Sequence, residues 1–200
     1  MKQNNYHHGD LKNALIDAGI NILKQEGVHG LSLRKTAKQA GVSHSAPYAH
    51  FKDKQALIAA ISARGLQQLY QKVSRFAAQY RAQPAVQLFE VAWAYTEFGI
   101  NDTGLFNIIF SNILECEHDD PEFIEISHRN FALIVDVIEN NQQAGILRQG
   151  NPDLLAVSIW SMIHGFIALV LEEQIPSTIL ENYDLKELLR ELLSQYTIVS

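Results

Sequence analysis

The chain has 200 residues, a net charge of −6, and 47% apolar against 19% charged residues. This balance is typical of a globular protein and excludes a disordered or collagen-like chain. The single cysteine excludes an intramolecular disulfide and favours the cytoplasm as the location. The charge is unevenly divided, because residues 1–60 carry +4 and residues 61–200 carry −10. A basic N-terminal part indicates an anionic partner.

Almost every segment repeats its apolar residues with the period of an α-helix, and strand signals are nearly absent. We therefore expect an all-α protein of about nine helices. The first helix should end at Gly27. Two short helices should follow, one over 33–40 capped by Ser32 and one that is capped by Ser43 and runs to about residue 50. Asp53 can cap a longer helix that begins at Lys54. The other helices are expected at 85–100, 105–115, from 121 to Gly145, from 152 to 171, and at 185–196.

The two short helices are separated only by Gly41-Val42-Ser43, which is the geometry of a helix-turn-helix. In DNA-binding proteins the second helix of this motif enters the major groove with its first residues at the base edges. His44 and Ser45 can hydrogen-bond to bases, and the residues that follow can hold phosphates. The candidate DNA-contacting residues are Arg34, Thr36, His44, Ser45, Tyr48, His50 and Lys54.

Residues 31–57, LSLRKTAKQAGVSHSAPYAHFKDKQAL, resemble the DNA-binding signature of TetR-type transcriptional repressors. The matching positions are Ala37, Gly41-Val42-Ser43, Tyr48, His50-Phe51, Lys54 and Leu57. The resemblance implies that the candidate residues above contact double-stranded DNA at a palindromic operator. Pro47 stands where the family usually has Leu, and Ala49 where it has an aromatic residue or Arg. Both departures bear on base preference.

The segment from Leu154 to Leu171 has no charged residue and is long enough to span a membrane. Polar residues inside it, acidic residues at both ends and the absence of a basic flank favour a buried core helix instead. We therefore expect no membrane partner.

Aromatic residues of the C-terminal part either line an apolar ligand cavity or fill the core. Trp160 and His164 lie one turn apart on the same helix face. A neutral buried His needs a hydrogen-bond partner, which either a ligand or a neighbouring group can supply. The candidate ligand-binding residues are Trp93, Phe98, Phe110, Phe131, Trp160 and His164.

Trp160 with His164-Gly165, and the opening segment 6–11, resemble a TetR subgroup named for a Trp-His-Gly motif in its C-terminal domain. This resemblance implies a homodimer in which each chain gives two helices to a four-helix bundle. The uncharged segment 154–171 and the leucine stripe 185–196 carry the apolar surface that such a bundle needs. We therefore expect a DNA-binding domain at 1–56 and an effector-binding and dimerisation domain at 57–200.

No phosphate-binding glycine loop, His-Glu-x-x-His or Gly-x-Ser-x-Gly motif occurs, so we expect neither an enzyme nor a cofactor. One cluster has metal-ligand residue types, but its spacing is irregular and we expect no metal there. Its members are Cys116, His118, Asp119, Asp120 and His128.

The sequence thus predicts a dimeric repressor that a small-molecule effector releases from its operator. Two alternatives remain open. One is a DNA-binding protein of the same fold without an effector, and the other is a helical protein-interaction module whose N-terminal head is vestigial.

Overall fold

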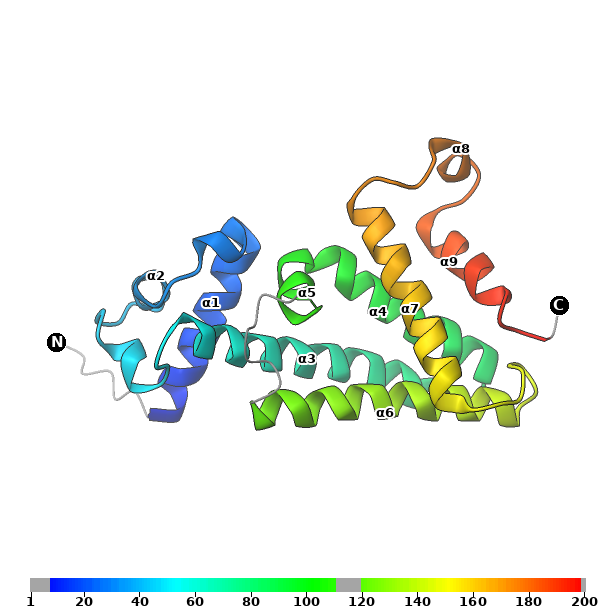
Figure 1. The fold of residues 1–200 in the computed structure, drawn as a ribbon, viewed down its shortest axis with the longest axis horizontal. Helices are drawn as coiled ribbons and strands as arrows, with labels where there is room; N and C mark the ends of the chain where they lie inside the picture. Colours follow the sequence, from blue (N-terminus) through cyan, green and yellow to red (C-terminus); the bar gives the residue numbers. More distant parts are fainter. Residues whose placement is uncertain (1–7, 111–119, 199–200) are drawn as a thin grey trace. The chain divides into compact units, whose positions relative to one another are not determined.

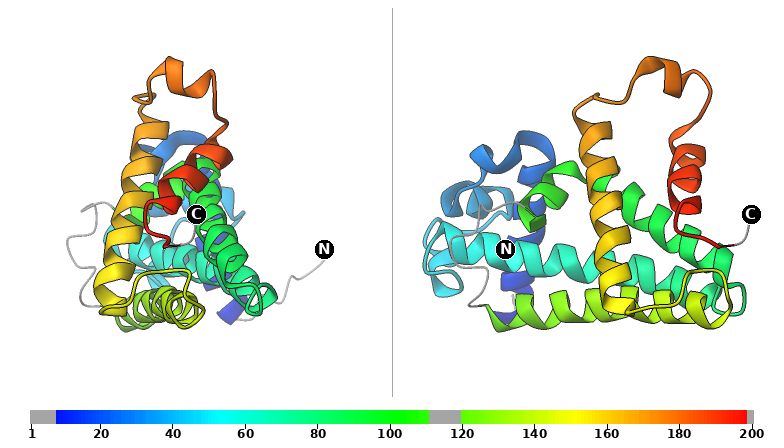
Figure 2. Two further views of the ribbon diagram at one scale, coloured as in Figure 1. Left: turned by 90° about the vertical axis from the view of Figure 1, so that its right-hand side faces the viewer. Right: turned by 45° about the vertical axis from the view of Figure 1, so that its right-hand side comes forward.

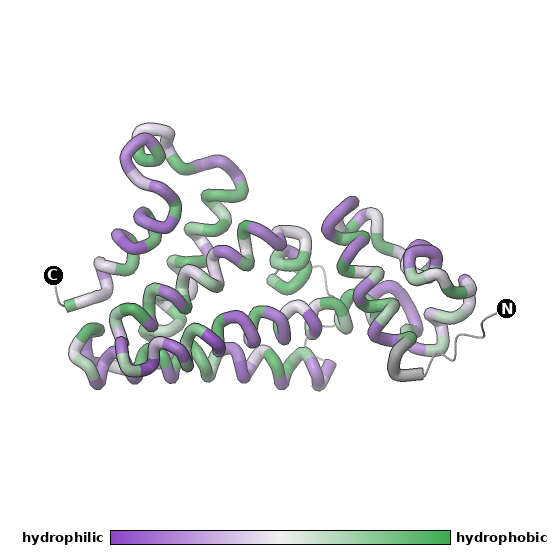
Figure 3. The backbone as a smooth tube through the Cα atoms, turned by 180° about the vertical axis from the view of Figure 1, so that it is seen from behind, coloured by the Kyte–Doolittle hydropathy of each residue, from purple (hydrophilic) through white to green (hydrophobic). Residues whose placement is uncertain are grey.

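The computed structural model describes residues 8–110 and 120–198 (Figure 1). Within these ranges the chain forms nine α-helices and one 3₁₀-helix, and its one β-type pairing is an isolated bridge between Leu147 and Thr197. The expectation of an all-α fold is confirmed. Hydrophilic and hydrophobic residues alternate along the helices (Figure 3), which is the pattern of helices that bury one face.

The chain divides into two compact units. The first unit comprises residues 1–67 and 102–126, and the second comprises residues 68–101 and 127–200. This division follows packing, and the functional boundary expected at residue 56 stays a prediction.

The first unit contains α1 (His8–Gly30), α2 (Leu33–Gln39), the 3₁₀-helix η1 (Ala46–Ala49) and α5 (Thr103–Phe110). The beginning of α3 (Lys54–Gln79) and of α6 (Pro121–Gln143) also belong to it. Helix α1 packs against α2 and α5. Gly27 has a φ of 69°, so the chain kinks where we expected α1 to end and then continues to Gly30. The fully buried side chains Leu15, Ile22, Leu57, Ile58 and Ile61 form the core of this unit.

The second unit contains the rest of α3 and α6, together with α4 (Pro84–Asn101), α7 (Pro152–Leu171), α8 (Ser177–Leu180) and α9 (Leu185–Ser194). Helix α4 packs against α7 and α9. Asn151 caps α7, and Asp184 with Glu187 forms a capping box at the start of α9. The sequence did not predict α8, a single turn within the connection between α7 and α9, at the top of both views in Figure 2.

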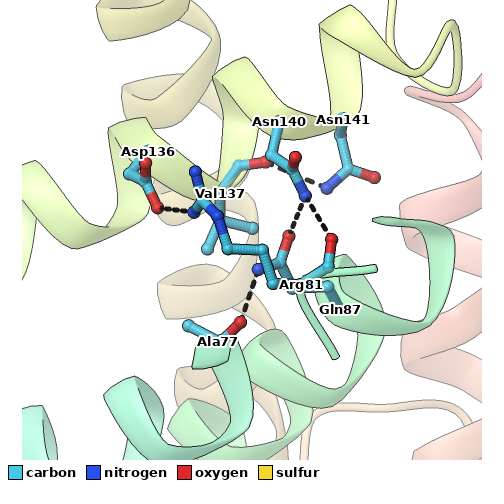
Figure 4. Close-up of polar contacts among 7 residues, drawn as sticks. All are labelled: Ala77, Arg81, Gln87, Asp136, Val137, Asn140 and Asn141. Atoms are coloured by element: carbon cyan, nitrogen blue, oxygen red, sulfur yellow. Dashed lines mark hydrogen bonds and ion pairs between the residues drawn. The ribbon is translucent and has the colours of Figure 1, made fainter. Parts of the chain in front are cut away.

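A buried polar network holds the turn between α3 and α4 against α6 (Figure 4). The Gln87 amide is fully buried; its nitrogen donates to the Ala77 carbonyl at 2.6 Å, and its oxygen accepts from Asn140 at 2.8 Å. Arg81 and Asp136 form an ion pair of 2.5 Å beside it. Since a buried amide without partners is costly, these bonds fix the position of Gln87 at the start of α4.

Candidate nucleic-acid interface and effector cavity

Helix α2 begins as its sequence predicts. The Ser32 side chain accepts a hydrogen bond from the Lys35 amide at 3.2 Å, and the Thr36 hydroxyl donates to the Ser32 carbonyl at 2.9 Å. After α2 the chain reverses at Gly41, whose φ of 70° is unfavourable for other residues. The Val42 amide donates back to the Ala37 carbonyl at 3.0 Å, which closes the turn.

The expected helix over 43–50, with Ser43 as its cap, was wrong in type and extent. The chain forms only the 3₁₀ turn η1, preceded by Ser45 and without a side-chain cap. Pro47 explains this, because an α-helix would need its amide N–H to donate to the Ser43 carbonyl, and proline has none. That carbonyl instead accepts from the Ala46 amide at 3.1 Å. Pro47 itself is buried.

Four of the candidate DNA-contacting side chains are exposed to solvent, one on α2 and three on the turn and η1. Arg34, His44 and Ser45 are exposed, and Tyr48 is 62% exposed. An aromatic side chain this exposed is unusual for a residue whose neighbours Pro47 and Phe51 are buried. The local backbone therefore exposes a set of polar side chains that can face a DNA duplex.

The other three candidates have partners or positions inside the first unit. Thr36 is fully buried, so it serves the start of α2 rather than the exposed surface. Lys54 donates to the Val28 carbonyl at 3.2 Å and thereby ties α3 to the end of α1. The Nε2 atom of His50 is buried and has no hydrogen-bond partner among the described residues.

A small apolar cavity of about 40 Å³ lies between α3, α4, α6 and α7 in the second unit. Among the described residues, no charged side chain lines it. Its wall includes Val73, Val91, Tyr95, Val137, Trp160 and Ile163.

Three polar side chains meet beside this cavity. The Trp160 indole N–H donates to the Tyr95 hydroxyl oxygen at 2.9 Å, and that hydroxyl lies 2.5 Å from Nε2 of His164. Burial lowers the pKa of His164 to about 4, so its imidazole is neutral near pH 7. Burial also raises the pKa of the Tyr95 hydroxyl, while its bond to Trp160 acts in the opposite direction. The hydroxyl can therefore donate its proton to an unprotonated Nε2.

The structure brings together three of the six candidate ligand-binding residues. Phe131 lies 6.3 Å from Trp160 between ring centroids, and Trp160 lies 5.1 Å from His164. The other three lie elsewhere. Trp93 has the Lys186 ammonium over its ring at 5.7 Å, Phe98 is buried in α4, and Phe110 belongs to the first unit, where it packs on Phe106 at 4.8 Å.

Sequence reasoning counted Tyr95 among the aromatic residues of the C-terminal part but did not single it out as a site residue. Its hydroxyl joins Trp160 to His164, which lie on a different helix. No spacing along the chain connects position 95 with 160 and 164, so only the packing of α4 on α7 could reveal it.

Helix α7 buries only one of its faces within the chain. By length and composition it is the one described helix that qualifies as a membrane span, and 33% of that window is buried. Leu154 is 70% exposed, Val157 44% and Leu169 48%. The expectation of a fully buried core helix was therefore wrong for the single chain, because one apolar face of α7 is left uncovered.

No group of three metal-ligating side chains lies close together within residues 8–110 and 120–198. Cys116, His118 and Asp119 of the cluster considered above lie outside the described residues, as does the end of the helix expected at 105–115.

Comparison with known proteins places both units in one family. Residues 15–61 match the model of bacterial regulatory proteins of the tetR family, and residues 88–196 match the tetracyclin repressor-like C-terminal domain. The HTH-type transcriptional regulator YobS of Bacillus subtilis (strain 168) is 26% identical over 159 residues, which cover 80% of this chain and 78% of YobS. The HTH-type transcriptional regulator AcrR of Shigella flexneri is 26% identical over 186 residues, 90% of this chain and 84% of AcrR.

A solved structure of a protein of unknown function from Rhodococcus sp. RHA1 has the same fold. It is 27% identical, the alignment covers 97% of this chain and 96% of that one, and the TM-score is 0.81.

The chain belongs to the TetR family of helix-turn-helix regulators. It is accordingly a DNA-binding transcriptional regulator, and its relatives are regulators rather than enzymes. The assignment to the subgroup with the Trp-His-Gly motif stays a prediction.

Proposed function

We propose that this protein is a repressor that binds a palindromic operator as a homodimer and leaves it when a small-molecule effector binds. The observation that carries the proposal is the exposed surface formed by Arg34, His44, Ser45 and Tyr48 around the turn and η1. His44 and Ser45 are proposed to reach base edges, and Arg34 and Tyr48 to hold phosphate oxygens. The net +4 of residues 1–60 supports binding to a polyanion.

The repressor is proposed to dimerise through α7 and α9. The uncovered face of α7 carries Leu154, Val157 and Leu169, and no charged residue stands between Leu154 and Leu171. On α9, Leu189 and Leu193 are buried within the chain, whereas Leu185, Leu188 and Leu192 are only partly covered. Two copies packed through these faces would form a four-helix bundle and cover this apolar surface.

Effector control is proposed to act through the cavity that Tyr95 and Trp160 line. Phe131 lies against Trp160, and His164 bonds the Tyr95 hydroxyl. A ligand that binds one arrangement of the dimer more tightly shifts the population toward it. Since dimeric helix-turn-helix proteins need their half-sites about 34 Å apart, a different arrangement releases the DNA. The protein is proposed to act in the cytoplasm, without a cofactor or a catalytic step.

A selection experiment tests this function. Bound sequences are enriched from a random duplex pool, and the affinity for the enriched duplex is then measured by fluorescence anisotropy over a series of salt concentrations. We expect a palindromic consensus and a log K that falls with log salt by about 0.9 for each phosphate contacted. A duplex with one scrambled half-site serves as the control. A slope near zero, or enrichment of no sequence, would contradict the proposal and favour a protein-interaction module.

A further inference from the structure

We propose that the effector is an uncharged, apolar small molecule that enters the cavity between α3, α4, α6 and α7. The inference deepens the effector release proposed above and rests on it for its regulatory consequence. It concerns the chemical class of the ligand, which follows from the side chains of this chain.

The wall of the cavity offers a ligand no charge. It is almost entirely apolar, and the charged residues of α4 and α6 lie outside its lining. A carboxylate or an ammonium group that entered would lose its hydration without gaining an opposite charge. An uncharged ligand loses little hydration and gains apolar contacts with residues such as Val91, Ile159 and Ile163.

Three polar groups at the edge of the cavity are engaged with one another, and the remaining polar lining residue, Asn130, carries no charge. The Trp160 indole donates to Tyr95, and the Tyr95 hydroxyl lies within hydrogen-bond distance of His164. Burial lowers the pKa of His164 and raises that of the Tyr95 hydroxyl, so both side chains are neutral near pH 7. The edge of the cavity therefore supplies neither a cation for an anionic ligand nor an anion for a cationic one.

The cavity also indicates a small ligand. Its volume of about 40 Å³ is far below the roughly 300 Å³ of a site for a drug-sized molecule. A single ring must displace side chains in order to enter. Leu133, Ile134 and Trp160 are only partly buried, whereas Val91 and Ile159 are buried, so the wall can yield on the side of α6 and Trp160.

Three probes with the same ring separate the ligand classes: benzyl alcohol, benzoate and benzylammonium. Binding to the full-length protein without DNA is followed by the two indole N–H signals in ¹⁵N NMR spectra. Trp160 lines the cavity and reports binding, while Trp93, which lies beside Lys186, serves as an internal reference. We expect benzyl alcohol to shift the Trp160 signal and to bind at least tenfold more tightly than either charged probe. Equal or tighter binding of a charged probe, or no shift with any probe, would overturn the inference.

A pair of matched variants places the probe in this cavity. Val91→Ala enlarges the cavity and should tighten benzyl alcohol binding severalfold. Val86→Ala removes the same atoms from the same helix at a position that is 39% exposed and outside the cavity lining, so it should leave binding unchanged. Ile163→Val also enlarges the cavity, but by less, because it removes only one carbon atom. Unchanged affinity in both enlarged variants would overturn the assignment to this cavity.

DNA release is measured separately, by anisotropy with the selected duplex. Benzyl alcohol that shifts Trp160 and leaves DNA bound would contradict effector release and support the ligand class. A molecule that releases DNA while the Trp160 signal stays in place would support the repressor function and overturn this inference.

Discussion

The hydroxyl of Tyr95 on α4 lies 2.5 Å from Nε2 of His164 on α7, and it also accepts a hydrogen bond from Trp160 at 2.9 Å. One hydroxyl thus connects two residues that are 69 positions apart in the chain, inside the second unit. Because this contact joins α4 to α7, which pack against each other, changes at either residue should be measurable in stability as well as in ligand binding.

Tyr95→Phe should destabilise the protein by about 1–3 kcal/mol, because it removes the hydroxyl that bonds both the partly buried Trp160 N–H and His164 Nε2. Urea unfolding followed by circular dichroism measures the loss. Tyr183→Phe removes a hydroxyl from a residue that is 42% exposed and should cost almost nothing. Equal stability of the two variants would show that the Tyr95 hydroxyl contributes little.

His164 should make stability depend on pH. Its pKa is about 4 in the folded chain and near 6.5 when unfolded, so between these values the unfolded chain binds more protons. Its stabilising contribution is therefore complete above about pH 6.5 and is lost as the pH falls toward 4. Urea midpoints from pH 7 to pH 4 should decline less steeply in His164→Asn than in the natural chain. The exposed His128→Asn variant should keep the full decline, and a parallel decline in all three proteins would contradict the assignment.

The exposed surface of the first unit predicts two different effects on DNA binding. Tyr48→Ala removes the proposed hydrogen bond to a phosphate, worth about 1 kcal/mol, and should weaken binding several-fold for every duplex. His44→Ala should change which bases are preferred. Affinity for the selected duplex and for single-base variants of it distinguishes the two. If both variants bind every duplex as tightly as the natural chain, the proposed contact residues are wrong.

Gln87→Met should destabilise the second unit by about 1–3 kcal/mol, because the Ala77 carbonyl and the Asn140 amide lose a buried partner (Figure 4). Gln83→Met, at an exposed position just before α4, is the matched control and should be nearly neutral. Unfolding midpoints of the two variants are compared at one pH. A smaller loss for the buried position than for the exposed one would contradict the role of the network.

Val157→Lys should convert the proposed dimer into a monomer, because it places a charge on the uncovered apolar face of α7. Sedimentation velocity measures the change. Val86→Lys introduces the same charge at a position on α4 that is 39% exposed and should leave the dimer intact. A dimer that persists in Val157→Lys places the interface elsewhere.

Helix boundaries were the most predictable part of this protein, because caps and stops act within a few residues. Ser32 and Asn151 cap their helices as the sequence indicated, and Asp184, which was not predicted as a cap, begins the helix expected from residue 185. The helix expected over 43–50 failed for an equally local reason, since Pro47 lacks the amide that an α-helix requires there. Pro47 is visible in the sequence, but we expected an α-helix there because the helix-turn-helix pattern usually has one.

Some candidate site residues could likewise be found from local sequence, whereas others depend on packing. Exposure of Tyr48, His44 and Ser45 follows from a turn and four residues of 3₁₀-helix, so spacing along the chain was sufficient to find them. The burial of Thr36 was not predictable from the sequence. Its hydroxyl can bond either a DNA phosphate or the Ser32 carbonyl, and tertiary packing decides between the two.

The sequence by itself determined the all-α class, the helix-turn-helix and the basic charge of its head, since these depend on periodicity, caps and composition within short stretches. Only the tertiary structure decided that Tyr95 joins Trp160 to His164, that Gln87 is buried against α6, and that α7 buries only one of its faces within the chain. These features arise where helices distant in the chain pack together, and the period of a helix shows which residues share a face but not which helix lies opposite.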